Sequence, residues 1–198
     1  MRAAWLPLSL MLILAGCDEP PPEPVTEEEP APPEPEPQAE PPAIGAIDAP
    51  ESGQAKVAVP TLNQGFEFPV QTLEAGFGRD DTMVLVELKA EGEGDLSVQL
   101  TFHEGSPATG DHTVADTPSD GATTAAVGGT QLRVLGGEVS VDALEDQRIA
   151  GSFDLEVREP RSPEPTRLRG RFDAARHRYY DGVIEHQRAI RDQLRNRR

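Results

Sequence analysis

The chain has one cysteine and few aromatic residues. Cys17 is the only thiol among 198 residues, so the chain forms no internal disulfide and no thiolate metal site. Aromatic side chains make up 5% of the sequence, and the only tryptophan is Trp5. The apolar stretch near the N-terminus, residues 3–15, is interrupted by Pro7 and Ser9 and is shorter than the roughly 20 residues that span a bilayer. We therefore expect packing alone to hold the fold together.

Positive charge is also scarce. The sequence has 18 Lys and Arg against 35 Asp and Glu, which gives a formal net charge of −17. Residues 43–157 hold 20 acidic and 5 basic residues. Such a charge balance disfavours nucleic acid and an anionic membrane surface as partners of this region.

The sequence contains none of the catalytic motifs that we sought: G-x-S-x-G, H-E-x-x-H and a phosphate-binding glycine loop. One set of residues, His103, Asp111 and His112, has side chains of the kind that bind divalent metals. They lie at the end of an expected strand and in the polar segment after it, without the spacing of a tight site. We therefore predict no metal, no cofactor and no enzymatic activity.

The N-terminus has the pattern of an export signal. A basic start, Met1-Arg2, is followed by about a dozen mostly apolar residues and by Leu14-Ala15-Gly16-Cys17. This motif resembles the lipobox of bacterial lipoproteins. The resemblance implies that residues 1–16 are removed, that the thiol of Cys17 is diacylated and that its new amino group is acylated. Acyl chains would anchor the protein in the membrane, because each buried methylene contributes about 0.8 kcal/mol.

The resemblance also implies a location. A lipoprotein of this kind is attached to the cell envelope by its N-terminal lipid and faces the periplasm. Asp18 follows the cysteine, and an aspartate there resembles the inner-membrane retention signal of enteric bacteria. We therefore favour the inner membrane over the outer membrane.

Residues 17–53 are expected to form a disordered linker. Within them, residues 18–42 hold eleven prolines, nine acidic residues and no basic residue. Proline removes backbone donors and fixes φ, so such a segment favours extended polyproline II at about 3.1 Å per residue. A spacer is the simpler interpretation, although proline-rich segments are also ligands for aromatic grooves.

Residues 54–173 are expected to form a β domain, because apolar and polar residues alternate with a period of two. The strongest expected strands cover residues 83–90, 96–102, 132–135, 138–143, 149–157 and 167–172, and weaker ones cover 56–59 and 66–72. Gly136-Gly137 is expected to be a two-residue hairpin turn. The pattern predicts a mainly β fold, an antiparallel meander that forms a small sandwich or barrel.

The faces of the strands predict their register. Apolar and charged residues match when Leu155 faces Leu168, Gly151 faces Phe172, Asp154 faces Arg169, Glu156 faces Arg167, Leu88 faces Val98 and Val84 faces Phe102. Met83 and Leu85 then lie on the second face of their strand and are also apolar. This strand needs cover on both sides.

A second resemblance is weaker and covers roughly 35 residues. The sequence Gly137-Glu138-Val139-Ser140-Val141, followed by Ile149-Ala150-Gly151-Ser152-Phe153 and Gly170-Arg171-Phe172, resembles a pattern in small uncharacterised bacterial lipoprotein domains. In that pattern a strand is followed by I-x-G-x-F and a closing G-x-F. The resemblance implies no catalytic residues.

Residues 174–198 are expected to form a basic amphipathic helix with Asp173 as its N-cap. Its apolar stripe consists of Tyr180, Val183, Ile184, Ile190 and Leu194. The helix could pack on its own domain, dock on an envelope protein or touch anionic lipid. Arg188, Arg191 and Arg195 are the candidates for partner docking.

The function that we expect is a membrane-anchored lipoprotein of the bacterial cell envelope with a non-enzymatic binding or structural β domain. One alternative is a periplasmic carrier that holds a small apolar ligand inside a β-barrel. The other is an enzyme of unknown class. A filled interior favours the first interpretation, and an empty apolar cavity favours the carrier.

Overall fold

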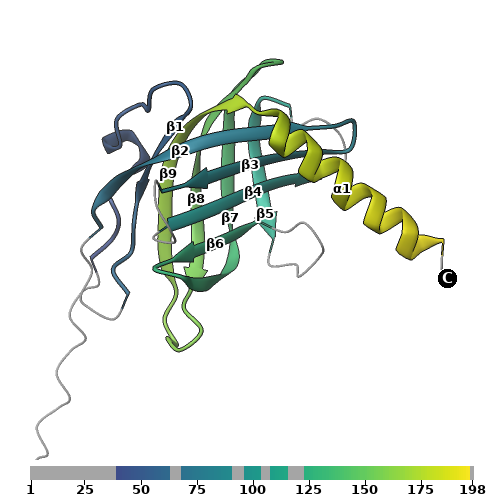
Figure 1. Ribbon diagram of the computed structural model, residues 1–198. Helices are drawn as coiled ribbons and strands as arrows, with labels where there is room; N and C mark the ends of the chain where they lie inside the picture. Colours follow the sequence, from purple (N-terminus) through teal and green to yellow (C-terminus); the bar gives the residue numbers. More distant parts are fainter. Residues whose placement is uncertain (1–38, 63–67, 91–95, 104–107, 116–122, 197–198) are drawn as a thin grey trace, which may run out of the picture. The chain divides into compact units, whose positions relative to one another are not determined.

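The computed structural model describes residues 39–62, 68–90, 96–103, 108–115 and 123–196. Their elements are η1 (Ile44–Ala46), β1 (Gln54–Ala58), β2 (Val70–Arg79), β3 (Met83–Lys89), β4 (Leu96–His103), β5 (Gly110–Ala115), β6 (Thr124–Val127), β7 (Thr130–Leu144), β8 (Arg148–Arg158), β9 (Thr166–Arg176) and α1 (Arg178–Arg195). Figure 1 shows the strands wrapping around one core, with α1 outside them. Within the described residues, no helix combines the length and apolar character needed to cross a membrane.

Eight strands close into a barrel. Following the chain, β1, β2, β3, β4, β6, β7, β8 and β9 each pair antiparallel with the next, and β9 pairs antiparallel with β1. The ninth strand, β5, pairs antiparallel with residues 136–141 of β7, which follow the residues of β7 that pair with β6. The structure therefore confirms the mainly β antiparallel meander with a C-terminal helix, and it selects the barrel over the sandwich.

The predicted register is confirmed in two hairpins. In β8–β9, Leu155 faces Leu168 and Asp154 faces Arg169. In β3–β4, Leu88 faces Val98. All six predicted cross-strand pairs are present. Burial of the apolar face fixes the pairing, because a slip by one residue would turn every side chain to the opposite face.

The predicted hairpin turn at Gly136-Gly137 is wrong, because both glycines lie inside the 15-residue strand β7. Gly137 has φ 142°, and a β-carbon there would lie 2.3 Å from the carbonyl oxygen of Asp154. The pairing with β8 shifts register between Val134 and Gly136. The glycines thus allow a bulge and a close strand contact. The turn lies instead at Gly128 and Gly129, whose positive φ values suit a two-residue hairpin between β6 and β7.

Other boundaries also differ from the sequence-based ones, most clearly those of β2 and of the start of the helix. β2 begins at Val70 and continues to Arg79, whereas the expected strand covered 66–72, of which 66 and 67 lie outside the described residues. Asp173 is not the helix N-cap, because it lies in β9 and binds Arg148. His177 is the N-cap, and its side chain accepts a hydrogen bond from the amide of Tyr179.

The expected linker ended at Gly53, but residues 39–53 lie on the barrel. We name these residues the N-terminal strap. Ile47 is only 1% exposed, although its neighbours are glycine, alanine, aspartate and proline. Two isoleucines, Ile44 and Ile47, among such residues are a weak signal, because they do not establish a period of two or 3.6 over a longer stretch.

Candidate interaction surface

Apolar side chains pack in the interior of the barrel. Among the described residues, this core contains 25 buried apolar residues, which come from all eight barrel strands and from Val59 just after β1 and include Phe77, Phe153 and Phe172. A β-carbon at Gly170 would lie 2.5 Å from the ring of Phe153, and one at Gly151 would lie 3.1 Å from the ring of Phe172. Gly170 thus makes room for the ring of Phe153, and Gly151 makes room for the backbone carbonyl of Ser140 as well as for the ring of Phe172. Eight-stranded barrels fill their interior with side chains or hold one small ligand, and a β-barrel of this kind is consistent with a binding or structural domain.

The candidate metal ligands do not form a described site. Asp111 accepts a hydrogen bond from the hydroxyl of Ser140. His112 contacts the ring of Phe102 edge-on, and its Nε2 lies 2.8 Å from the carbonyl oxygen of Ala108. His103 ends β4, and its side chain lies outside the described part. Among the side chains that are described, no three His, Cys, Asp or Glu residues are grouped to hold a metal ion.

Arginines on the outer face of β9 hold the N-terminal strap. Arg169 donates to the carbonyl of Pro41 at 2.9 Å, and Arg171 donates to the carbonyl of Ile47 at 3.3 Å. Arg169 also binds Asp154 at 2.9 Å, as its predicted cross-strand position suggests. The arginine row therefore has a structural role, which is to fix the segment that precedes β1.

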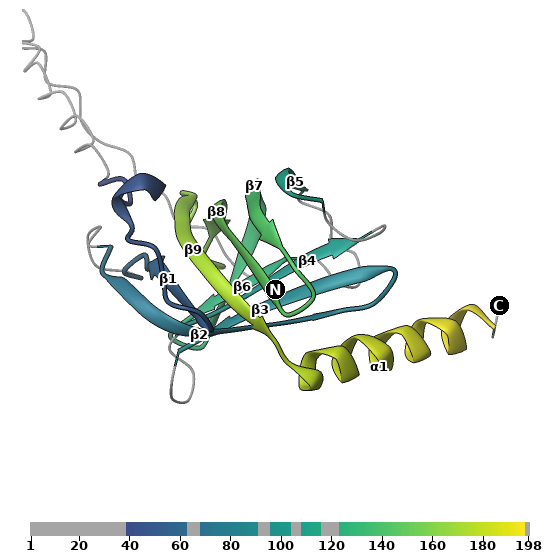
Figure 2. The same ribbon diagram turned by 90° about the horizontal axis from the view of Figure 1, so that it is seen from above.

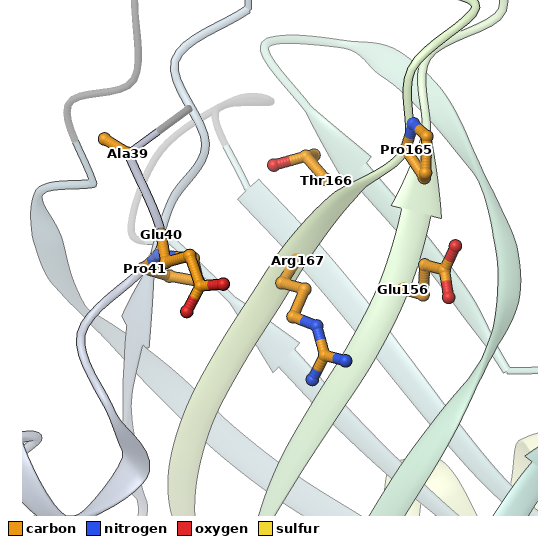
Figure 3. Close-up of a pocket in the computed structure, with 7 residues that line it drawn as sticks. All are labelled: Ala39, Glu40, Pro41, Glu156, Pro165, Thr166 and Arg167. Carbon is orange, nitrogen blue, oxygen red and sulfur yellow. The ribbon is translucent and has the colours of Figure 1, made fainter. Parts of the chain in front are cut away.

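A polar pocket of about 330 Å³ lies where the strap reaches β8 and β9. Figure 3 shows Glu40 and Pro41 on the strap side, Arg167 on β9 and Glu156 on β8. The guanidinium of Arg167 is already paired with Asp154 at 2.8 Å. The pocket thus combines the carboxylates of Glu40 and Glu156 with an arginine that is paired with a third carboxylate.

Helix α1 lies on the outer face of β2 and β3. Two glycines of β2 let the helix approach closely: a β-carbon at Gly76 would lie 2.4 Å from the ring of Tyr180, and one at Gly78 would lie 2.4 Å from its backbone carbonyl carbon. Ile184 is 0% exposed and packs with Met83 and Leu85. This contact confirms that the helix covers the second apolar face of the strand at 83–89.

Polar contacts fix the start of α1. The amide of His177 donates to the carbonyl of Phe77 at 2.9 Å. Asp181 accepts hydrogen bonds from the amide of Arg79 at 3.1 Å and from Nε of Arg176 at 3.3 Å. Asp181 is not among the residues that the sequence pattern indicated. The pattern that could have identified it is an acidic residue in the first turn of an expected helix, shortly after a strand that ends in a basic residue.

A second pocket, of about 420 Å³, lies between this helix start, β2 and β9. Both tyrosines of the chain, Tyr179 and Tyr180, line it together with His177 and Glu74. The two tyrosine rings meet edge-on with their centres 5.3 Å apart. Burial raises the pKa of Tyr180, and the carboxylate of Glu87 adds to the increase. The phenol therefore stays neutral and serves packing.

The contact between α1 and the barrel ends near Arg188. Its Nη1 lies 3.7 Å from Oδ2 of Asp80, in the turn between β2 and β3. Partial burial raises the pKa of Asp80, but hydrogen bonds from Thr82 and Met83, together with Arg188, outweigh it and lower the pKa below the ordinary value of 3.8. Arg188, a predicted docking residue, therefore contacts the barrel itself.

The last turns of α1 extend beyond the barrel. We call residues 178–188 the docked segment and residues 189–195 the projecting segment. In both views the C-terminal end of α1 lies away from the strands (Figures 1 and 2). Ile190 is 45% exposed and Leu194 is 56% exposed. Within the described residues, Arg191 and Arg195 have no ion-pair partner, so the projecting segment presents apolar and basic side chains to its surroundings.

Comparisons with protein-family models, with curated proteins and with solved structures found no match. Cys17 and Asp18, the predicted lipidation and sorting residues, lie outside the described residues.

Proposed function

We propose that this protein is a lipid-anchored protein of the bacterial cell envelope, whose β-barrel is a rigid non-enzymatic support for a binding surface on α1. Cys17 carries the lipid, the following residues form the tether, and the N-terminal strap joins the tether to the barrel. The barrel and its helix face the periplasm. Asp18 favours retention at the inner membrane.

The observation that carries this proposal is the placement of the strap and of the helix end. The strap leaves the barrel on one side, and the C-terminal end of α1 lies on the other side in both views (Figures 1 and 2). The strap and the projecting segment therefore lie on opposite sides of the barrel, and the barrel leaves the projecting segment available to a partner. The apolar core of the barrel supports the same conclusion, because side chains packed in the interior favour recognition on the outside of the barrel.

The electrostatics are compatible with this arrangement. The chain as a whole is strongly acidic, so the barrel should not adhere to an anionic membrane surface. Acyl chains at Cys17 would supply the membrane affinity, since stable anchoring takes at least two such signals. The tether would then keep the barrel at a distance from the bilayer.

Mass spectrometry of the protein purified from native membranes tests the anchor. We expect a peptide that begins at Cys17 and carries thioether-linked diacylglycerol and an amide-linked acyl chain. A Cys17→Ala variant should remain unprocessed and lose this modification. An unmodified thiol in the native product, or partition of the protein into detergent-free buffer, would refute the proposal.

Subcellular fractionation tests the location. We expect the native protein in the inner-membrane fraction and an Asp18→Ser variant in the outer-membrane fraction, with Glu19→Ser as the matched control. If the native protein and both variants fractionate together with the outer membrane, the sorting role of Asp18 is wrong, but the anchor is unaffected.

A further inference from the structure

The pocket at the start of α1 gathers both tyrosines of a chain that is poor in aromatic residues. Its volume of about 420 Å³ falls within the roughly 300–1,000 Å³ that is common for small-molecule sites. The planes of the Tyr179 and Tyr180 rings meet at 75°, and both residues line the pocket. Tyr179 is 63% exposed, more than any other large apolar side chain among the described residues. The two rings therefore form adjoining walls, and that of Tyr179 is open to a ligand.

A carboxylate without a partner lies in the same pocket. Glu74 is exposed on β2 and lines the pocket, and within the described part of the chain its carboxylate makes no hydrogen bond or ion pair. Lys89 faces Glu74 across the β2–β3 ladder, but its ammonium group is paired with Glu87 at 2.5 Å. The negative charge of Glu74 is therefore available to a ligand.

The charges around the pocket favour a cation. Burial is the main cause of the raised pKa of Tyr180, and the carboxylates of Glu87 and Glu74 add to it, whereas Lys89 opposes them. Two carboxylates thus act on this phenol against one ammonium group. Arg176, at the end of β9, is already paired with two aspartates. An anionic ligand would be repelled by the unpaired carboxylate.

The start of the helix does not reverse this preference. Free backbone amides at a helix N-terminus attract negative charge. Here the amides of Tyr179 and Tyr180 donate to His177 at 3.2 and 3.0 Å, and Asp181 supplies a carboxylate in the first turn. Arg178 precedes the tyrosines and does not line the pocket. The positive end of the helix is therefore largely offset within the protein itself.

A guanidinium group matches these walls better than other organic cations. It stacks on aromatic rings and donates parallel hydrogen bonds to a carboxylate, whereas a lysine ammonium is a point charge and a quaternary ammonium has no donor. We propose that the pocket binds the side chain of an arginine in a partner peptide or protein, with the guanidinium on the ring of Tyr179 and hydrogen-bonded to Glu74. This inference goes beyond the proposed function, because it requires neither the lipid anchor nor the projecting segment.

Titration of the tyrosine ring signals with an arginine derivative tests the pocket. The chain has two tyrosines and both line the pocket, so selective ¹³C labelling of tyrosine rings gives NMR signals from this site alone. The probe is Nα-acetylarginine methylamide, added to the full chain with Cys17→Ser, which carries no lipid. We expect both ring signals to shift, with a Kd in about the millimolar range for a single side chain.

Two other derivatives test the chemistry of the ligand. Nα-acetylcitrulline methylamide has nearly the same shape as the probe but no charge, and it should bind at least about threefold more weakly. Nα-acetyllysine methylamide keeps the charge without the planar donors, and it should also bind more weakly than the probe. The order of the three affinities therefore separates a guanidinium site from a general cation site.

Substitutions separate the pocket from the general attraction of an acidic protein. Glu74→Gln removes the carboxylate and Tyr179→Leu removes the exposed ring, and each should weaken binding at least about threefold, as read from the Tyr180 signal. Both side chains are exposed, so neither change should disturb the fold. Glu185→Gln is the matched control, because it makes the same change of charge at an exposed position of α1 outside the pocket. It should leave the affinity unchanged.

Four outcomes would overturn the inference. The first is no shift of the ring signals at concentrations well above the millimolar range. The second is equal binding of the arginine and citrulline derivatives, and the third is equal or tighter binding of the lysine derivative. The fourth is equal weakening by Glu74→Gln and Glu185→Gln, which would mean that binding follows the net charge. Because the chain carries no lipid, each of these failures is distinguishable from failure of the proposed anchor.

Discussion

The two parts of α1 have the same amphipathic pattern and different surroundings. In the docked segment, Ile184 is fully buried against β3, and Asp181 is bonded to Arg79 and Arg176. In the projecting segment, Ile190 and Leu194 are about half exposed. An apolar stripe shows that a helix needs a surface, but the stripe alone does not reveal where that surface ends. Short helices in water are marginal without packing, so the docked segment must support the projecting one.

The largest difference should appear when the same substitution is made in each segment. Ile184→Ala removes a fully buried side chain and should lower the free energy of unfolding by about 2–4 kcal/mol. Ile190→Ala removes a half-exposed side chain and should cost less than about 1 kcal/mol. Urea denaturation measures both values. Hydrogen exchange of the α1 amides would detect undocking of the helix without global unfolding. If Ile184→Ala and Ile190→Ala changed the free energy of unfolding equally and changed the exchange rates equally, the division into two segments would be wrong.

The next largest effect should come from the strand under the docked segment. A β-carbon at Gly78 meets the backbone of Tyr180 and Asp181 at 2.4–2.6 Å, so Gly78→Ala should force the helix outward and cost about 1–3 kcal/mol. Gly45→Ala is the matched control, because no atom lies within 4 Å of the new methyl group. Urea denaturation again supplies the measurement. A Gly78→Ala protein as stable as the control would show that the helix does not rest on β2.

A smaller effect depends on pH and marks the end of the docked segment. The folded-state pKa of Asp80 is lowered, so its stabilising contribution is present above the unfolded value of about 3.8 and is lost as the pH falls through the folded value. Asp80→Asn should cost about 1 kcal/mol at neutral pH and progressively less below about pH 4. Unfolding in urea across this range, with exposed Asp81→Asn as the control, checks the sign. A constant difference at all pH values would contradict it.

The sequence predicted the register and the strand face that needs cover because both depend on burial. Asp154 faces Arg169 only when the apolar residues on the other face of each strand also match. Met83 and Leu85 indicated a covered outer face because a strand that is apolar on both sides must be buried on both. These inferences needed only local alternation and the requirement that each apolar face be covered.

Other features depend on contacts between distant residues and could not be read from local patterns. Gly76 and Gly78 weaken the strand signal of β2 in the sequence. In the structure Tyr180 lies on both residues and leaves no room for a larger side chain. Gly136-Gly137 has the composition of a turn and serves a bulge in β7 instead. Arg188, Arg191 and Arg195 form one predicted group, but only Arg188 lies within reach of Asp80. The helical periodicity of the sequence does not indicate where the contact with the barrel surface ends.

The smallest effect tests how the two segments are connected. Gly182 lies in the docked segment, and a β-carbon there would meet no atom within 4 Å. Gly182→Ala should therefore stabilise the helix by about 0.5–1 kcal/mol, since alanine loses less backbone entropy on folding. If the docked segment supports the projecting one, the amides of residues 189–195 should exchange more slowly in this variant, although they lie well away from residue 182. Ala189→Gly is the converse change, and it should speed exchange in the projecting segment while leaving the docked one unaffected. Unchanged exchange beyond Arg188 in Gly182→Ala would mean that the two segments fray independently, and the projecting segment would then need its own partner to remain helical.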